Sequence, residues 1–312
     1  MANHRPQGRG NYRHRYRKKV RTQAVLEVSA SAQGISKQTI CRWFGYSRQA
    51  HHQALVATHR KVFEAEMICQ IVKTIRKQAG KRLGTLKAYG KAKPELEQLG
   101  IKCGRDKFYD VLRDADMLIK PKKTRVRTTD SSAWMRQFDD LRCGFKPTGP
   151  DQLWCADITY IACEEQKLYL SLITDEYSRQ IMGFELHSSL KTSGPLLALK
   201  RALARRVKSR NRIIHHSDRG CQYVSRGYVR KPRKNGLKIS TTQNGSPYEN
   251  PMAESVNGQL KVEYDLDQVF KTKQQAQAVV LCSIQQYNEY RPHGSLNMRT
   301  PCQVHYGQLK DT

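Results

Sequence analysis

Three carboxylates in the C-terminal half of the sequence stand where a metal site would place them. Asp157 lies inside an otherwise hydrophobic run, where an unpaired charge is costly. Asp218 follows the apolar segment RIIHHS, and Glu254 lies in a predicted helix, NPMAESVNGQLKVEYDL, that Pro251 opens. Carboxylates that converge from neighbouring elements bind hard cations such as Mg²⁺ and leave coordination positions for phosphate oxygens. Taken singly, each also fits an ordinary role as a strand, turn or surface-helix residue.

The segments around these carboxylates predict a mixed sheet. Three successive segments rich in aromatic and aliphatic residues predict an antiparallel meander at residues 153–161, 167–174 and 179–187. A helical stripe and two short apolar segments then predict a parallel crossover at residues 195–207, 212–216 and 237–240. The expected fold class is therefore α/β, with a mixed sheet as in ribonuclease H.

The charge of the chain indicates its partner. Its 312 residues contain 56 Lys and Arg against 27 Asp and Glu, a formal net charge of +29. Such an excess repels itself unless a polyanion binds, so nucleic acid is the leading partner and an anionic membrane the next. Residues 1–149 hold 33 basic and 12 acidic residues, whereas residues 150–312 hold 23 and 15, so most of the excess lies in the N-terminal half.

Other features of composition bear on location and redox state. No segment approaches the roughly 20 apolar residues of a membrane-spanning helix, and a soluble intracellular location is expected. The nine cysteines form no CxxC pair, which predicts reduced and mostly buried thiols in place of a disulfide framework or a structural zinc site.

The N-terminal half has two candidate DNA-binding regions. Residues 35–56 predict two short helices, with Ser36 and Ser47 as N-caps, Gly45 at the turn and Arg48 on the second helix. Residues 83–119 predict a further helical region, which glycines and a proline are expected to interrupt: Gly84, Gly90, Pro94 and Gly100.

The last helix of this second region is predicted to begin after Gly104 and to expose Arg105 and Lys107. A small helical domain with a solvated basic face is the alternative, because spacing does not separate a recognition helix from a scaffold helix.

We therefore expect four parts. They are a basic helix-turn-helix segment (1–60), a second helix-turn-helix-like domain (61–122), a basic linker (123–149) and a ribonuclease-H-like catalytic core (150–312). Residues 120–129 look like a flexible stretch able to lie along phosphates, and the polar loop 241–248 is expected to move over substrate.

Four longer strings strengthen the metal-site interpretation. They occur in the order WCADITYI, HHSDRGCQY, NGSPYENPMAESVNGQLKVEY and YNEYRPHGSLNMRTP, and 35 residues (219–253) separate Asp218 from Glu254. Together they resemble the D, D, 35, E core of insertion-sequence DDE transposases of the IS-three family (OrfB type), relatives of retroviral integrases. The resemblance covers about residues 35–305.

This resemblance implies a metal-dependent polynucleotidyl transferase. Asp157, Asp218 and Glu254 would be both the catalytic residues and the ligands of Mg²⁺, with two ions and with Mn²⁺ as a substitute. The enzyme would cut a DNA strand to free a 3′-hydroxyl and join that hydroxyl to another phosphodiester.

The resemblance also implies supporting residues. Lys261, seven residues after Glu254 and on the same helix face, would pair with a DNA phosphate. Further DNA contacts are expected from Arg48, Arg105, Lys107, Arg219 and Arg291. Asp175 is expected to be structural, and His215 and His216 either orient a ligand or contact DNA, or simply pack.

The partners implied are double-stranded DNA, as terminal inverted repeats and as target, further copies of the chain and a protein from an upstream frame. The location implied is the bacterial cytoplasm, at the nucleoid. Two rivals remain open: a ribonuclease-H-like nuclease that does not join strands, and a catalytically inactive DNA-binding regulator.

Overall fold

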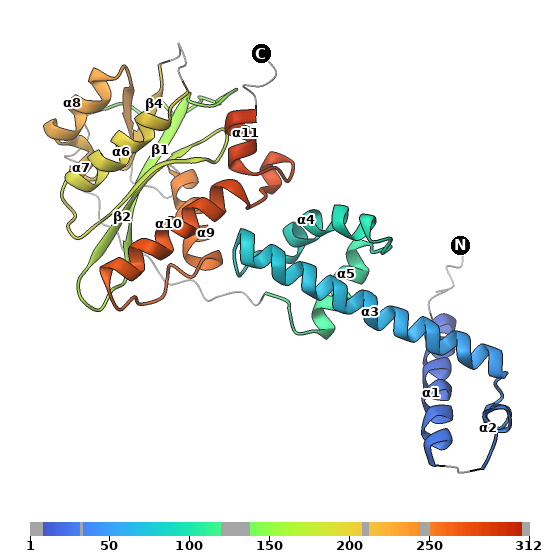
Figure 1. Ribbon diagram of the computed structural model, residues 1–312. Helices are drawn as coiled ribbons and strands as arrows, with labels where there is room; N and C mark the ends of the chain where they lie inside the picture. The colour runs from blue at the N-terminus through green and yellow to red at the C-terminus, as the bar shows by residue number, and fades with distance from the viewer. Residues whose placement is uncertain (1–8, 32–33, 120–137, 208–211, 244–249, 308–312) are drawn as a thin grey trace, which may run out of the picture. The chain divides into compact units, whose positions relative to one another are not determined.

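The computed structural model describes residues 9–31, 34–119, 138–207, 212–243 and 250–307. The chain divides into two compact units, Met1–Gln70 and Ile71–Thr312, and the division falls within one helix, α3 (Arg48–Ala79) (Figure 1). The expected flexible stretch 120–129 and residues 244–248 of the expected mobile loop lie outside the described residues.

The first unit consists of α1 (Arg9–Ser31), α2 (Lys37–Trp43) and the first part of α3. The predicted caps are confirmed, because Ser36 accepts a hydrogen bond from the Thr39 amide at 3.2 Å and Ser47 from the Ala50 amide at 3.0 Å. Of the two helices predicted in residues 35–56, the second corresponds to α3. It was predicted to be short, which is wrong: α3 has 32 residues, because no glycine or proline occurs between Arg48 and Ala79.

The second unit begins with a helical region that contains α4 (Thr85–Gln98) and α5 (Arg105–Asp114). Helix α5 follows Gly104 as predicted. The prediction that Gly90 and Pro94 interrupt the chain is wrong, since both lie inside α4. Complete burial of Ala88 and Ala92, and near-complete burial of Leu96, holds α4 together against the cost of an interior proline.

A five-stranded mixed sheet forms the centre of the second unit, in the order β3-β2-β1-β4-β5. Its strands are β1 (Leu153–Ile161), β2 (Leu168–Asp175), β3 (Ile181–His187), β4 (Ile214–Ser217) and β5 (Lys238–Thr241). Strands β1, β2 and β3 pair antiparallel, whereas β4 pairs parallel with both β1 and β5. The predicted meander and crossover are confirmed, and the fold is ribonuclease-H-like.

Helices cover both faces of this sheet (Figure 1). One face packs against α6 (Ser193–Arg205), α7 (Cys221–Val224) and α8 (Arg226–Lys234). The other packs against α9 (Pro251–Glu263) and α10 (Lys273–Glu289). A short 3₁₀ helix, η3 (Gly294–Leu296), and α11 (Pro301–Gly307) follow.

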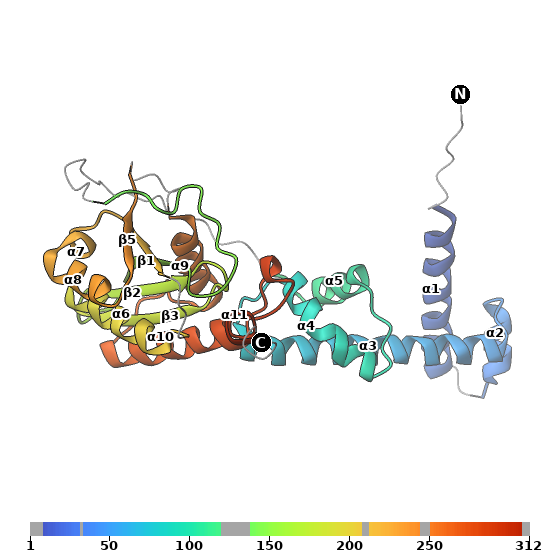
Figure 2. The same cartoon turned by 90° about the horizontal axis from the view of Figure 1, so that it is seen from above.

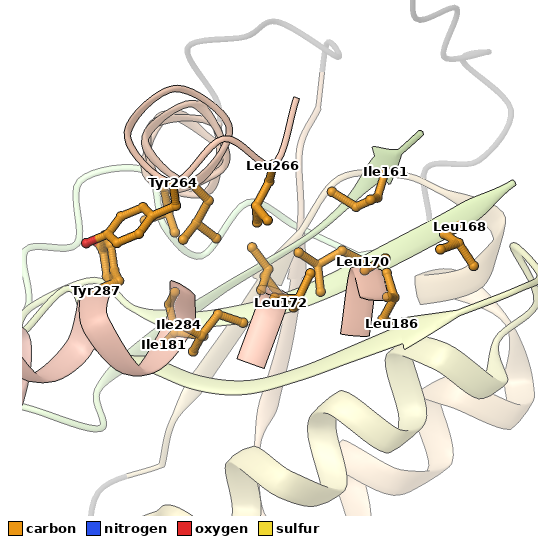
Figure 3. Close-up of a cluster of buried hydrophobic side chains, with 14 of the residues drawn as sticks. Ile161, Leu168, Leu170, Leu172, Ile181, Leu186, Tyr264, Leu266, Ile284 and Tyr287 are labelled. Carbon is orange, nitrogen blue, oxygen red and sulfur yellow. The ribbon is translucent and has the colours of Figure 1, made fainter. Parts of the chain in front are cut away.

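The largest buried cluster lies between the sheet and the second helical layer (Figure 3). Leu170, Leu172 and Ile181 from the strands meet Tyr264 and Tyr287 from the helical side, and all five are buried. Side chains alternate along β1, so Leu153 and Cys155 face α9 while Trp154 and Ala156 face α6. This alternation also decides the direction in which Asp157 points.

The nine cysteines are all free thiols, as predicted. The expectation that most are buried is wrong, because only Cys41 and Cys155 are. In the part of the chain that the structure describes, no helix is long and apolar enough to cross a membrane.

Substitution of Gly183 in β3 tests how closely this strand packs on α6. A Cβ at this position would overlap the carbonyl oxygen of Ala198 and lie 2.7 Å from the backbone nitrogen of Ala202. We expect Gly183→Ala to lower the free energy of unfolding by about 1–3 kcal/mol in urea denaturation, because backbone atoms cannot move aside cheaply.

The matched control is Gly258→Ala on α9, where an added Cβ would meet nothing within 4 Å. It should stabilise the helix by about 0.5–1 kcal/mol. Equal stability of the two variants would contradict the close approach of β3 and α6.

Candidate active site

Asp157 lies within β1, and Asp218 directly follows the neighbouring strand β4. The parallel pairing of β1 with β4 ends at Ala156 opposite Ser217. Asp157 and Asp218 are the next residues along the chain, Asp157 still within β1 and Asp218 directly after the end of β4. Asp157 shares the face of Leu153 and Cys155, so it points toward α9 and is only 7% exposed. The first two predicted carboxylates therefore stand on, or directly after, two paired strands of the sheet.

Helix α9 is bound to β1 at two points that flank Glu254. Asn250, at its N-cap position, donates through Nδ2 to the carbonyl oxygen of Ala156 at 3.1 Å. Asn257 donates through Nδ2 to Oδ2 of Asp157 at 2.6 Å. Residues 250, 254 and 257 share one face of a helix, so Glu254, which is half-buried, stands between the two contacts. Glu254 lies in the first turn of the helix.

The charges of both aspartates influence the buried Tyr223 on α7. Burial raises the pKa of Tyr223 well above its ordinary value, and the charges of Tyr228, Asp218 and Asp157 raise this pKa further. Among the described residues, the buried Tyr223 hydroxyl has no hydrogen-bond partner. Asp218 is itself oriented by the Gly220 amide, which donates to its Oδ1 at 3.1 Å.

The chemical types of the side chains at the candidate site suit a hard cation such as Mg²⁺. The predicted site residues on β1, after β4 and on α9 are carboxylates, and carboxylate oxygens are the ligand type that Mg²⁺ prefers. The side-chain oxygens of Asn250, Asn257 and Tyr223 are buried and lack hydrogen-bond partners within the described residues, and hydrated cations carry water that can donate to such oxygens. Within those same residues, no three His, Cys, Asp or Glu side chains are grouped closely enough to hold a metal ion.

Comparison with known proteins identifies the family. Residues 147–247 match a family described as integrase core domain, and residues 235–301 match a second family with that description. The insertion element IS600 uncharacterized 31 kDa protein of Shigella sonnei is 31% identical over 269 residues, which cover 84% of this chain and 96% of that protein.

The chain belongs to the insertion-sequence transposases with an integrase core domain.

Two other relatives match this chain over only about half of their own length. The transposase for insertion sequence element IS629 of Shigella sonnei is 36% identical over 54% of this chain and 56% of its own length. Transposase InsF for insertion sequence IS3A of Escherichia coli K12 is 35% identical over 49% of this chain and 53% of its own. The chain thus spans about half the length of these two relatives.

A solved structure of the HTLV-2 integrase catalytic core domain in complex with magnesium superposes with a TM-score of 0.41 and 16% identity. It covers 51% of this chain and 99% of that one.

The predicted DNA-contact residues occupy different environments in this transposase. Arg48 and Arg105 are exposed, Arg105 beside Asp106 at 3.2 Å. Lys107 and Lys261 are half-buried, and the Lys107 ammonium donates to the Lys102 carbonyl at 3.1 Å. By contrast, Arg219 and Arg291 are 4% and 1% exposed. Neither buried arginine presents its side chain to a ligand at the surface.

Arg291 forms an internal ion pair at the end of α9. Its guanidinium donates to both carboxylate oxygens of Glu263, at 2.7 Å and 2.6 Å. Burial lowers the pKa of Arg291, but the hydrogen bonds and charge of Glu263 outweigh this effect and leave the pKa raised. Lys87 of α4 reaches the same carboxylate at 3.4 Å. We therefore propose an internal role for Arg291 in place of the expected DNA contact.

The two histidines before Asp218 are packed. His215 Nε2 lies 2.7 Å from the Tyr228 hydroxyl, and His216 Nδ1 lies 2.9 Å from the Ser240 hydroxyl. Burial, and then the neighbouring His216, lower the pKa of His215 to about 3, so its ring is neutral at physiological pH. The sequence left open whether these histidines act on a ligand or DNA or simply pack, and packing is what the structure shows.

Asp175 is structural, as predicted. Its carboxylate accepts hydrogen bonds from the Asp151 amide at 2.8 Å and from the Ser178 hydroxyl at 2.7 Å. It is fully buried at the end of β2, where these bonds hold the turn into β3.

Sequence reasoning missed three residues of the site. Asn257, Glu263 and Tyr223 were not singled out, although each contacts or influences a residue that was. The spacing carried a signal for Asn257, because an amide three residues after Glu254 shares its helix face. No comparable signal marked Glu263, whose partner is distant in sequence.

Asn257→Ala tests the anchor of α9. Loss of the donor to the buried Asp157 carboxylate should lower the free energy of unfolding by about 1.5–3 kcal/mol, the range for hydrogen bonds to charged groups. Urea denaturation at pH 7 measures the change. The control is Gln259→Ala on the same helix, whose bond to Ser255 is exposed and whose loss should cost under about 0.5 kcal/mol. Equal costs would show that the Asn257 contact does not anchor α9.

Arg291→Lys tests the internal ion pair. Lysine keeps the charge but cannot reproduce the two-pronged contact with Glu263, so we expect a loss of about 3 kcal/mol in stability, as for broken buried pairs. Arg113→Lys, at an exposed pair with Asp110, should change stability by less than about 0.5 kcal/mol. A stable Arg291→Lys protein with weakened DNA binding would instead support the original expectation of a DNA contact.

Proposed function

We propose that this chain is the catalytic protein of an insertion sequence, which binds the ends of the element, frees a 3′-hydroxyl and joins it to another phosphodiester. The observation that supports the proposal most strongly is that Asp157 lies on β1 and Asp218 directly follows the paired strand β4, while Asp157 accepts a hydrogen bond from the helix that carries Glu254. Membership of the transposase family supports the same conclusion.

The chain's own residues prepare an acidic site for an in-line displacement at phosphorus. Asn257 and the Gly220 amide orient the carboxylates of Asp157 and Asp218, and α9 presents Glu254 from the opposite side. When bound, divalent ions activate the attacking oxygen and stabilise the leaving oxygen. We propose Mg²⁺ as the natural ion, two ions per site and Mn²⁺ as a substitute, with Asp157, Asp218 and Glu254 as the ligands.

Two successive displacements account for the reaction without a covalent protein intermediate. In the first, water attacks a phosphodiester at the element end, and the P–O3′ bond breaks to release a 3′-hydroxyl. In the second, that hydroxyl attacks another phosphodiester, so one P–O3′ bond forms as another breaks. No protein nucleophile is needed, and the tyrosines of the chain keep structural roles.

The parts of the chain have separate tasks in this proposal. Residues 150–312 carry out the chemistry, and the helical parts within residues 1–122, with Arg48, Arg105 and Lys107, contact the terminal repeats. Residues 123–149 connect them. Lys261, on the same helix as Glu254, meets a phosphate near the site. Two element ends must be held together, so the active form is an assembly of several copies on DNA, and a protein from an upstream frame is a further partner.

Strand cleavage and transfer on labelled element ends test the function. Wild-type protein with Mg²⁺ should release a 3′-hydroxyl product and should join a pre-cut 3′-hydroxyl donor to a second duplex. Glu254→Gln, which removes one anionic ligand without changing size, should lower both rates at least about 100-fold, as expected when a metal ligand or its support is lost.

Other outcomes identify the rivals. Cleavage without joining of the pre-cut donor would indicate a nuclease. Sequence-specific DNA binding with no metal-dependent reaction in either protein would indicate a regulator. A change in salt concentration should not restore the cleavage and joining rates of Glu254→Gln, because its defect lies in the chemical step and not in DNA binding.

A further inference from the structure

The outward side of α8 is a cationic surface that the active site does not use. Tyr228, Val229 and Pro232 point inward and are buried. The remaining positions form two rows along the helix, at residues 226, 230 and 233 and at residues 227, 231 and 234. Apart from one glycine these positions hold exposed cations, which we name the α8 cationic face: Arg226, Arg230, Lys231, Arg233 and Lys234.

In the parts of the chain that the structure describes, no negative charge balances this face. The sequence has no Asp or Glu between residues 219 and 248. Among the described residues, no carboxylate lies within ion-pair distance of any of the five cations. Elsewhere in the same unit arginines are paired, such as Arg142 with Glu176 and Arg201 with Glu185. Like charges three and four residues apart repel each other along a helix, so the face favours binding of a polyanion.

The helix presents these charges on a rigid base. The Ser225 hydroxyl caps its start by accepting from the Tyr228 amide at 3.3 Å, and the Tyr228 hydroxyl bonds His215 in the sheet at 2.7 Å. The Arg233 guanidinium lies 5.6 Å from the centre of the Phe138 ring. A fixed array of cations loses little entropy on binding, which favours an ordered phosphate backbone.

The position of α8 connects this face with the active site. The helix joins β4 to β5 and lies beside α7 and β5 (Figure 2). Because β4 and β5 are parallel, α8 runs back from the end of β4, where Asp218 lies, toward the start of β5. The exposed Lys238 at the start of β5 adds a further cation at the far end.

The chemistry of the surface favours nucleic acid over protein. The outward positions of α8 contain no apolar or aromatic side chain. Protein interfaces have apolar centres and are depleted of lysine, whereas DNA backbones are bound by lysine and arginine. The nine residues of α8 extend about 13 Å, which equals the rise of about four nucleotides along the duplex axis at 3.4 Å each.

We propose that the α8 cationic face binds the phosphate backbone of DNA as it leaves the active site. This inference rests on the proposed function, because it assigns a second contact for the same substrate. Its contacts are independent of base sequence, and they add to any recognition by the N-terminal helices.

The test compares two double variants of equal charge. Arg230→Gln/Lys234→Gln removes two cations from the face. Lys167→Gln/Lys271→Gln removes two exposed lysines elsewhere, one between β1 and β2 and one between α9 and α10. Binding to a labelled duplex of random sequence is measured by fluorescence anisotropy at several salt concentrations without divalent metal. Thermal melting and circular dichroism establish that both variants are folded.

Each lost phosphate contact should reduce the slope of log Kobs against log[salt] by about 0.9. We therefore expect a slope smaller by about 2 for the α8 variant and an unchanged slope for the control. Equal slopes for wild type and both variants would overturn the inference and leave the proposed function intact. If wild-type protein itself bound no duplex, both would be overturned.

Polyglutamate distinguishes an acidic protein partner. If the α8 variant lost affinity for labelled polyglutamate but kept its affinity for duplex DNA, the face would belong to an acidic protein, and the DNA assignment would be overturned. Loss of duplex affinity in the α8 variant alone supports the assignment.

Discussion

The hydrogen bond from Asn257 to Asp157 is the contact on which the site depends. A buried carboxylate is costly without donors, and this one lies inside a sheet where the backbone donors already serve strand pairing. The donor must therefore come from another layer. Because Asn257 and Glu254 share one helix face, the bond that satisfies Asp157 also sets the position of Glu254. Stability and the arrangement of the carboxylates thus follow from the same interaction.

The opposite end of α9 is held by charge. Glu263 receives two hydrogen bonds from Arg291 and one from Lys87 of α4, and the Tyr264 hydroxyl that follows donates to the Ala79 carbonyl at 3.0 Å. The helical region at the start of the second unit is therefore bound to the helix that carries Glu254. A rigid helix fixed at both ends cannot slide or rotate freely, so residues far from the carboxylates contribute to their alignment.

The charges of the second unit are separated in space. The carboxylates of the proposed site are carried by β1, by the residue after β4 and by the first turn of α9, and cations without described carboxylate partners lie on the outer side of α8. Such a separation suits a polyanionic substrate, because cations attract the backbone while the acidic centre is left to bind a metal ion. Paired arginines such as Arg291 do not take part, since their charge is already neutralised inside the fold.

The sequence by itself determined the strands, the caps and the three carboxylates. Runs of aromatic and aliphatic residues marked β1 and β2, and the serine hydroxyls marked the helix starts. Four sequence strings in order, with the spacing between Asp218 and Glu254, indicated the family. These are local signals, or spacings along the chain, and they need no knowledge of packing. Only the tertiary structure decided that Arg291 is internal, that α4 continues through Pro94 and that Asn257 holds Asp157. Burial and pairing depend on which faces meet, and residues such as Glu263 and Arg291 meet only after the chain has folded.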